Sequence, residues 1–185
     1  MGDVLMTRFD VIDNLVLVGF MGAGKSTVAA ELSRLTGWQV YDLDAILVRE
    51  QGRSITDIFQ SDGENVFREI ETTTLRHLIP LKQGIVSTGG GIVGRPENWS
   101  LMHQLGPVVY LRATWQTLWQ RICDCEERPL VKQVDDGAGT RALWESRLAL
   151  YEQADWVIDT DGLTPVEIAR KILGQGNIRW QQKSV

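Results

Sequence analysis

Cysteine, long apolar runs and basic charge are all scarce in this 185-residue sequence. Cys123 and Cys125 lie too close together for an easy disulfide and have no further pair to complete a zinc site, so we interpret them as reduced thiols on a helix. No stretch approaches the roughly 18 apolar residues of a membrane span, so we expect a cytoplasmic protein without a membrane partner. The formal net charge of −5 is opposite in sign to the basic surface typical of nucleic-acid binding, which predicts no nucleic-acid partner.

The composition is that of a folded domain, with 43% hydrophobic and 23% charged residues. A length of 185 residues suits one α/β domain with a mobile insertion, and a second full domain is not expected. We expect a single domain over residues 1–185, with terminal extensions at 1–13 and 174–185, and take a monomer as the working expectation.

The most informative stretch is 19–27, Gly-Phe-Met-Gly-Ala-Gly-Lys-Ser-Thr, which matches the phosphate-binding loop G-x-x-x-x-G-K-[ST]. The apolar run 15–18 precedes it and helical periodicity over 28–35 follows it, so the loop joins a buried strand to a helix. The amides of such a loop and the positive end of the helix can hold a polyphosphate, with Lys25 at its terminal phosphates and the Ser26 hydroxyl on Mg²⁺. A glycine-rich turn that precedes a helix by chance is the alternative, and it requires both flanks and every fixed position to coincide.

Short apolar runs alternate with helical periodicity along the whole chain. The expected strands are 15–18, 38–41, 84–88, 108–111 and 155–159. The expected helices are 28–35, 45–50, 63–79, 114–125, 140–153 and 165–173, with Val66, Trp115 and Trp119 among the expected packing residues. This order predicts a three-layer α/β fold, in which helices flank a five-stranded parallel sheet and ligands gather at the carboxyl ends of the strands.

Two carboxylates, Asp42 and Asp44, follow the second expected strand. On an extended chain, residues two apart point to the same side, which suits a metal ion or a polyol at this edge of the sheet. For Asp44 alone, the alternative is the N-cap of helix 45–50.

Three successive glycines, Gly89, Gly90 and Gly91, follow the third expected strand. Because such a run costs conformational entropy, it suggests that something approaches the backbone closely, and a plain flexible turn is the alternative. On helix 63–79, Arg68 and Glu71 are three residues apart and therefore neighbours; taken alone, Arg68 is a solvated helix residue.

Segment 126–141 joins two expected helices and is rich in Asp and Gly. Such a loop is a candidate for a mobile lid, and Arg128 near its start could swing onto a phosphate.

Together these motifs resemble the shikimate kinase family, which belongs to the P-loop nucleoside monophosphate kinase-like group. The resemblance rests on residues 22–27, Asp42-x-Asp44, Phe67-Arg68-x-x-Glu71, Gly89-Gly90-Gly91, Arg121, Arg128-Pro129-Leu130 and Arg147-x-x-x-Tyr151. It covers residues 19–151 and implies a P-loop kinase fold with a mobile lid. The implied reaction is ATP-dependent phosphorylation of the 3-hydroxyl of shikimate, in the pathway to chorismate and the aromatic amino acids.

The resemblance also implies roles for individual residues. Arg68 and Arg147 would grip the shikimate carboxylate, with Glu71 holding Arg68 in place. Asp44 would orient or deprotonate the attacking hydroxyl, as the catalytic residue beside Lys25 and Arg128, which would neutralise the transferring phosphoryl group. The ATP-binding residues would be Gly22, Ala23, Gly24, Lys25, Ser26, Thr27, Arg121 and Arg128, with Arg121 stacked on adenine. Ser26 and Asp42 would hold Mg²⁺. The shikimate-binding residues would be Asp44, Arg68, Gly89, Gly90, Gly91 and Arg147.

The loop 159–163 lacks the basic residue that family members often place near the nucleotide base. Two other functions fit parts of the sequence. A kinase for another hydroxy acid, such as gluconate, would share the phosphate loop, whereas the aspartate pair and the triple glycine favour shikimate. A nucleotide-dependent switch is the other alternative, but the sequence has no Asn-Lys-x-Asp motif for reading a guanine base.

Overall fold

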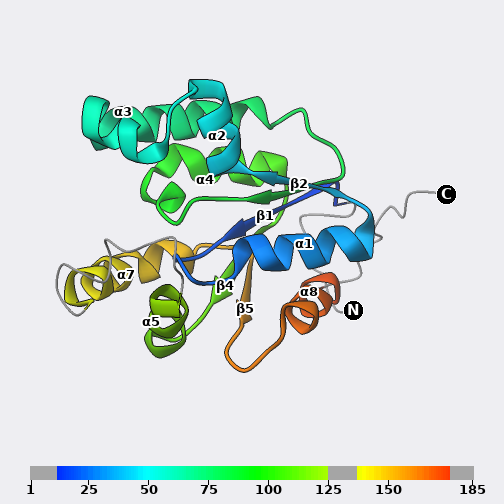
Figure 1. Ribbon diagram of the computed structural model, residues 1–185. Coiled ribbons are helices and arrows are strands. Elements are labelled where there is room, and N and C mark those ends of the chain that lie inside the picture. Colours follow the sequence, from blue (N-terminus) through cyan, green and yellow to red (C-terminus); the bar gives the residue numbers. More distant parts are fainter. Residues whose placement is uncertain (1–11, 125–136, 176–185) are drawn as a thin grey trace, which may run out of the picture.

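The computed structural model describes residues 12–124 and 137–175 (Figure 1). The strands are β1 Asn14–Val18, β2 Gln39–Asp42, β3 Gly84–Ser87, β4 Val108–Arg112 and β5 Trp156–Asp159. The α-helices are α1 Lys25–Thr36, α2 Leu43–Gln51, α3 Ile55–His77, α4 Pro96–Leu105, α5 Trp115–Asp124, α7 Ala138–Tyr151 and α8 Pro165–Leu173, and a short 3-10 helix, η1, covers Ile92–Gly94. Arg128, Cys125 and most of the expected lid lie outside the described residues.

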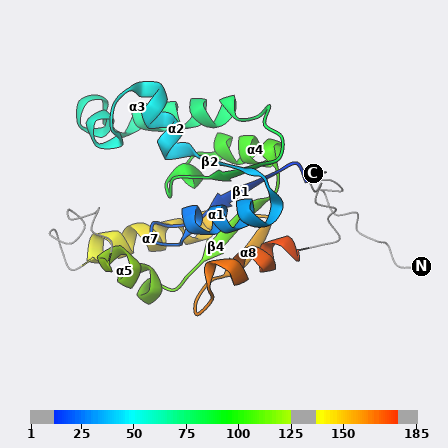
Figure 2. The ribbon, with the colours of Figure 1, turned by 45° about the vertical axis from the view of Figure 1, so that its right-hand side comes forward.

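The five strands form one parallel sheet in the order β2-β3-β1-β4-β5. Central strand β1 pairs with β3 and β4, and all five of its residues are buried, as expected for a strand covered on both faces. The chain leaves β1 toward β2 and later returns toward β5, so right-handed crossovers place α1 and α3 on opposite faces. Helix α1 packs on α8, and α4 packs on α3 and β1, which completes three layers (Figures 1 and 2). The predicted fold is confirmed.

Several helix ends follow directly from local sequence signals. Gly37 adopts a left-handed conformation (φ 72°) and its N–H donates to the Ser33 carbonyl, which ends α1. A capping box at Ser54 starts α3, and a second at Thr164 starts α8. These side chains satisfy first-turn amides that have no partner within the helix. No helix in the described ranges is long and apolar enough to cross a membrane.

The second strand is too short to hold both Asp42 and Asp44 in the extended conformation expected from the sequence. Strand β2 ends at Asp42, and α2 begins at Leu43, so Asp44 lies in the first helical turn. Asp42, not Asp44, is the N-cap, because its carboxylate accepts a hydrogen bond from the Ala45 N–H at 3.1 Å. The prediction that both carboxylates lie on an extended chain is therefore wrong, and so is the N-cap alternative for Asp44.

Helix α3 is broken at Gly63, whose φ of 82° and ψ of 171° are not helical. After this break Phe67, Glu71 and Leu75 form the buried face, so Val66 lies outside it and is 38% exposed. Leu143 on α7 is likewise exposed, at 40%. Val66 was expected to face inward; the helical period placed it near the apolar stripe, but packing buries the neighbouring Phe67 instead.

Three segment boundaries also differ from expectation. Residues 92–105, to which the sequence patterns assign no element, form η1 and α4, with Pro96 in the first turn of α4. Ile12, inside the expected terminal extension 1–13, is only 1% exposed and belongs to the core. Residues 138–141 of the expected lid already belong to α7.

Candidate functional site

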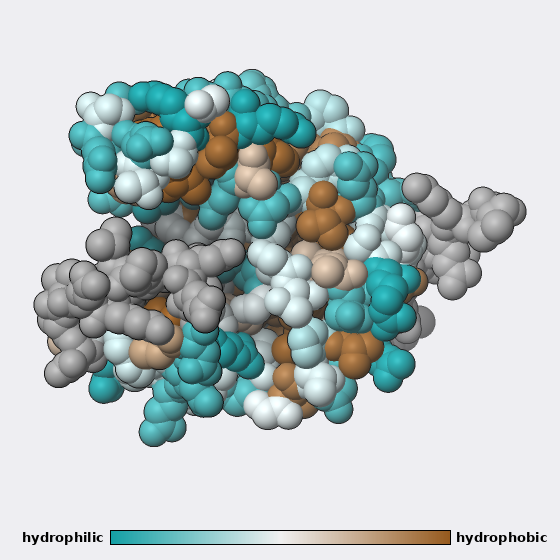
Figure 3. Space-filling view, viewed as in Figure 1, coloured by the Kyte–Doolittle hydropathy of each residue, from teal (hydrophilic) through white to brown (hydrophobic). Residues whose placement is uncertain are grey.

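A pocket of about 480 Å³ opens at the carboxyl ends of β1, β2 and β3. In the space-filling view the surface is hollowed below α2 and α3 (Figure 3). The pocket is lined by Met21, Lys25, Ser26, Asp42, Asp44, Ile55, Phe59, Glu64, Phe67, Arg68, Glu71, Ser87, Thr88, Gly89, Gly90, Gly91, Leu143 and Arg147. It therefore combines the start of α1, the turn after β3, and side chains from α2, α3 and α7.

The phosphate loop connects β1 to α1. Its Gly24 is the N-cap of α1 and has a φ of 87°, a left-handed conformation that favours glycine. Because glycine has no side chain to accept from the first-turn amides, the positive end of α1 is suited to an external anion. Lys25 follows at once and donates from Nζ to the carbonyls of Gly19 at 2.8 Å and Phe20 at 3.2 Å.

Arg121 contacts the phosphate loop from α5, donating from Nη1 to the Gly22 carbonyl at 3.2 Å. A Cβ atom at Gly22 would lie 3.1 Å from the Leu118 carbonyl oxygen of the same helix, so this loop position tolerates little more than glycine. The pocket lining includes Lys25 and Ser26 but not Gly22, Ala23, Gly24, Thr27 or Arg121, which lie in or against the loop.

Ser26 and Asp42 meet at the pocket wall, where the serine hydroxyl donates to Asp42 Oδ2 at 3.3 Å. Oxygen ligands of this kind suit Mg²⁺, which in proteins commonly takes one or two carboxylates, keeps several waters and binds substrate phosphates. Within the described part of the chain, no three His, Cys, Asp or Glu side chains form a metal-binding group by themselves. The donor set thus fits a magnesium ion shared with a polyphosphate better than a metal bound entirely by protein.

The triple glycine lies where two carboxylates and a guanidinium approach the backbone. A Cβ atom at Gly89 would be 2.9 Å from Asp44 Oδ1 and 3.1 Å from Glu71 Oε1, and one at Gly91 would overlap the guanidinium of Arg68. The structure favours the close-approach interpretation over a plain flexible turn, and the groups that approach are protein side chains.

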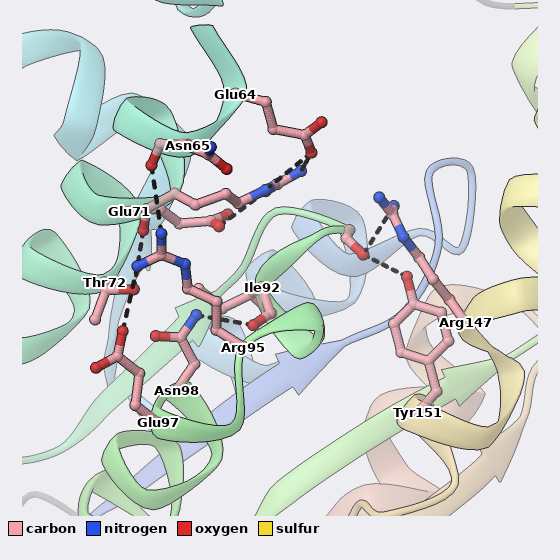
Figure 4. Close-up of polar contacts among 12 residues, drawn as sticks. Glu64, Asn65, Glu71, Thr72, Ile92, Arg95, Glu97, Asn98, Arg147 and Tyr151 are labelled. Carbon is pink, nitrogen blue, oxygen red and sulfur yellow. Dashed lines mark hydrogen bonds and ion pairs between the residues drawn. The ribbon is translucent and has the colours of Figure 1, made fainter.

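Two arginines from different elements enter the pocket. Arg147 on α7 donates from Nη1 to the Gly90 carbonyl at 3.3 Å, and the Tyr151 hydroxyl donates to the same oxygen at 2.5 Å (Figure 4). Arg68 on α3 donates from Nη1 to Glu71 Oε2 at 2.8 Å. The solvated state that the sequence suggested for Arg68 taken alone is wrong, because its side chain is only 17% exposed.

Burial dominates the electrostatics of this cluster. It raises the pKa of Glu71, and the adjacent Arg68 guanidinium only partly offsets that effect. Burial lowers the pKa of Arg68, but the Glu71 and Glu64 carboxylates outweigh it, so the net shift is upward and the guanidinium stays charged. Burial also raises the pKa of Tyr151, which keeps its phenol protonated as the donor to Gly90.

Sequence reasoning missed some of the lining. Glu64 could have been found from its i,i+4 spacing to Arg68. The apolar residues Phe59 and Leu143 carry no local signal for a pocket, because only the tertiary packing brings α3 and α7 to the same cavity. Arg128 lies outside the described residues.

Comparison with known proteins agrees with these motifs. The family model described as shikimate kinase matches residues 21–176. The shikimate kinase of Thermodesulfovibrio yellowstonii is 37% identical over 160 residues, covering 86% of this chain and 92% of its own, and that of Geobacter sulfurreducens is 41% identical over 159 residues, covering 86% and 88%. A solved structure of shikimate kinase from Acinetobacter baumannii in complex with shikimate has a TM-score of 0.81 at 36% identity, covering 89% of this chain and 93% of that one. On its sequence, its fold and the motifs gathered at this pocket, the chain belongs to the shikimate kinase family.

Proposed function

We propose that this protein transfers the terminal phosphoryl group of ATP to the 3-hydroxyl of shikimate, giving shikimate 3-phosphate and ADP on the way to chorismate and the aromatic amino acids. The observation that carries the proposal is one pocket lined by Lys25 of the phosphate loop, by Asp44, and by both Arg68 and Arg147. A polyphosphate site and a carboxylate site would therefore lie within one cavity.

The nucleotide is assigned to the phosphate loop. The amides of 22–27 and the Lys25 ammonium would hold its phosphates, and Arg121 would lie beside the base. Ser26 and Asp42 would hold Mg²⁺, which when bound supplies positive charge to the phosphate oxygens. Arg128 is proposed as a further charge on the phosphoryl group, from the sequence alone.

The acid is assigned to the α3 and α7 side of the pocket. Arg147 and Arg68 would bind its carboxylate, and Gly89, Gly90 and Gly91 would form the wall against which the ring lies. Asp44 would orient the 3-hydroxyl or take its proton as the new P–O bond forms and the bond to ADP breaks. The solved relative from Acinetobacter baumannii is in complex with shikimate, which supports this choice of acid.

Release of ADP, coupled to a reporter enzyme, tests the proposal with shikimate present and absent. We expect shikimate-dependent turnover that the Lys25→Ala variant loses while its circular dichroism spectrum is retained. Gluconate under identical ATP tests the open-chain alternative, and faster turnover of gluconate would reject shikimate as the substrate. A single domain with a lid at 126–141, a monomeric state and a cytoplasmic location stay predictions from the sequence.

A further inference from the structure

The guanidinium of Arg68 has two carboxylate partners within its own helix. Its Nη1 donates to Glu71 Oε2 at 2.8 Å. Its Nε and Nη2, which share the opposite edge, both donate to Glu64 Oε1, at 3.3 and 3.2 Å. Figure 4 shows the Glu64 and Glu71 side chains reaching the same guanidinium. Glu64 therefore occupies the edge whose two parallel N–H groups could bind a carboxylate in the bidentate manner typical of arginine.

The two partners differ sharply in exposure. The Glu71 side chain is 1% exposed, whereas the Glu64 side chain is 63% exposed. A buried partner cannot leave without a large desolvation cost to the charge that remains, but an exposed ion pair contributes little and is easily exchanged. Glu71 is thus a fixed partner of Arg68, and Glu64 is a replaceable one.

The balance of charge around Arg68 also indicates that Glu64 is the replaceable partner. Glu71 alone can compensate the single positive charge of Arg68, so Glu64 adds a negative charge at the wall to which the proposed function assigns the substrate carboxylate. The Glu64 carboxylate would remain stabilised after it releases Arg68. Glu64 directly follows the break at Gly63 and so begins the second helical segment, where the helix dipole stabilises a negative charge.

We propose that Glu64 is a competing carboxylate, which occupies the Nε/Nη2 edge of Arg68 and must give way when the carboxylate of the substrate binds. The inference rests on the proposed function, because it assumes that Arg68 binds the acid. Glu64 then weakens acid binding to the ground state and to the transition state alike, and it acts on KM for the acid rather than on kcat.

The test compares Glu64→Gln with the wild type in steady-state kinetics. We expect KM for shikimate to fall by about 2- to 5-fold, the range that corresponds to loss of an exposed ion pair, with kcat and KM for ATP unchanged. Raising the ionic strength to about 1 M, where the Debye length is about 3 Å, should remove most of the difference. The methyl ester of shikimate, which carries no carboxylate charge, should inhibit both proteins equally.

The matched control is Glu69→Gln, an equal loss of charge at an exposed position of the same helix that does not line the pocket. It should leave both KM values unchanged. An unchanged or higher KM for shikimate in Glu64→Gln would overturn the inference, since Glu64 would then be neutral or would position Arg68. If the wild type shows shikimate-dependent turnover in the same assay, the proposed function stands whatever the result for Glu64→Gln. If the wild type shows none, both the proposed function and the inference about Glu64 are overturned.

Discussion

At the scale of single residues, the two pocket arginines are held in different ways. Arg68 is an ion-pair partner of a buried carboxylate, whereas the hydrogen bond from Arg147 goes to a neutral backbone carbonyl. The charge of Arg147 is therefore the less compensated of the two, and we expect it to contribute strongly to binding an acid.

Replacing Arg147 with alanine should raise KM for shikimate far more than KM for ATP. The loss should be about 2–5 kcal/mol in kcat/KM for shikimate if the arginine meets a desolvated carboxylate. Initial-rate kinetics with each substrate varied separately measures both constants. Arg170→Ala, an exposed arginine on α8, serves as the control, and an unchanged shikimate KM in Arg147→Ala would argue against a carboxylate at Arg147.

Glu71→Gln should reveal how the buried carboxylate affects stability as the pH changes. A carboxyl group whose pKa is raised by folding stabilises the native state most below its unfolded pKa, and this contribution is lost as the pH rises through the folded pKa. The free energy of unfolding of the wild type, minus that of Glu71→Gln, should therefore fall as the pH rises from about 4 to 7. Urea unfolding of both proteins at several pH values measures this difference, and a difference that grows with pH would mean that Arg68 lowers the pKa of Glu71.

At the scale of elements, α5 and α7 are joined by tryptophan side chains. Trp115 stacks on Trp119 with ring centroids 5.4 Å apart and contacts Trp144 of α7 at 5.7 Å. The interpretation of Trp115 and Trp119 as packing residues is confirmed, since both pack against the main core. This contact connects the helix that carries Arg121 to the helix that carries Arg147.

Gly137 lies where this cluster meets the start of α7. Its φ is 83°, and a Cβ atom there would be 2.5 Å from the Trp119 ring. Gly137→Ala should therefore destabilise the protein by more than the roughly 1 kcal/mol of left-handed strain. The matched variant is Gly52→Ala, because Gly52 has a φ of 63° but open space around its Cβ position. Urea unfolding of both variants gives the comparison, and equal losses would show that the Trp119 contact is unimportant.

At the scale of the whole molecule, the pocket is built by segments that lie far apart in the sequence. Residues of the phosphate loop, α2, α3, the turn after β3 and α7 all line it. A ligand that bridges them binds the native state and not the unfolded chain, so its affinity appears as stability.

Shikimate at about 100 times its Kd should raise the free energy of unfolding by about 2.7 kcal/mol. Gluconate at the same concentration should have a much smaller effect, because an open-chain acid does not fit the proposed ring site equally well. Thermal and urea unfolding with each acid measure the two effects. Equal stabilisation by both acids would favour a broader hydroxy-acid kinase.

The sequence by itself determined the features that depend on neighbouring residues. The phosphate loop, the five parallel strands and the capping boxes at Ser54 and Thr164 could all be predicted, because glycine conformation, apolar periodicity and side-chain caps act within a few positions. Only the tertiary structure decided that Glu71 is buried against Arg68, and that α7 brings Arg147 to the same pocket as Arg68 of α3. Those outcomes depend on which helix faces pack together across the sheet, a balance of long-range contacts that local spacing does not encode.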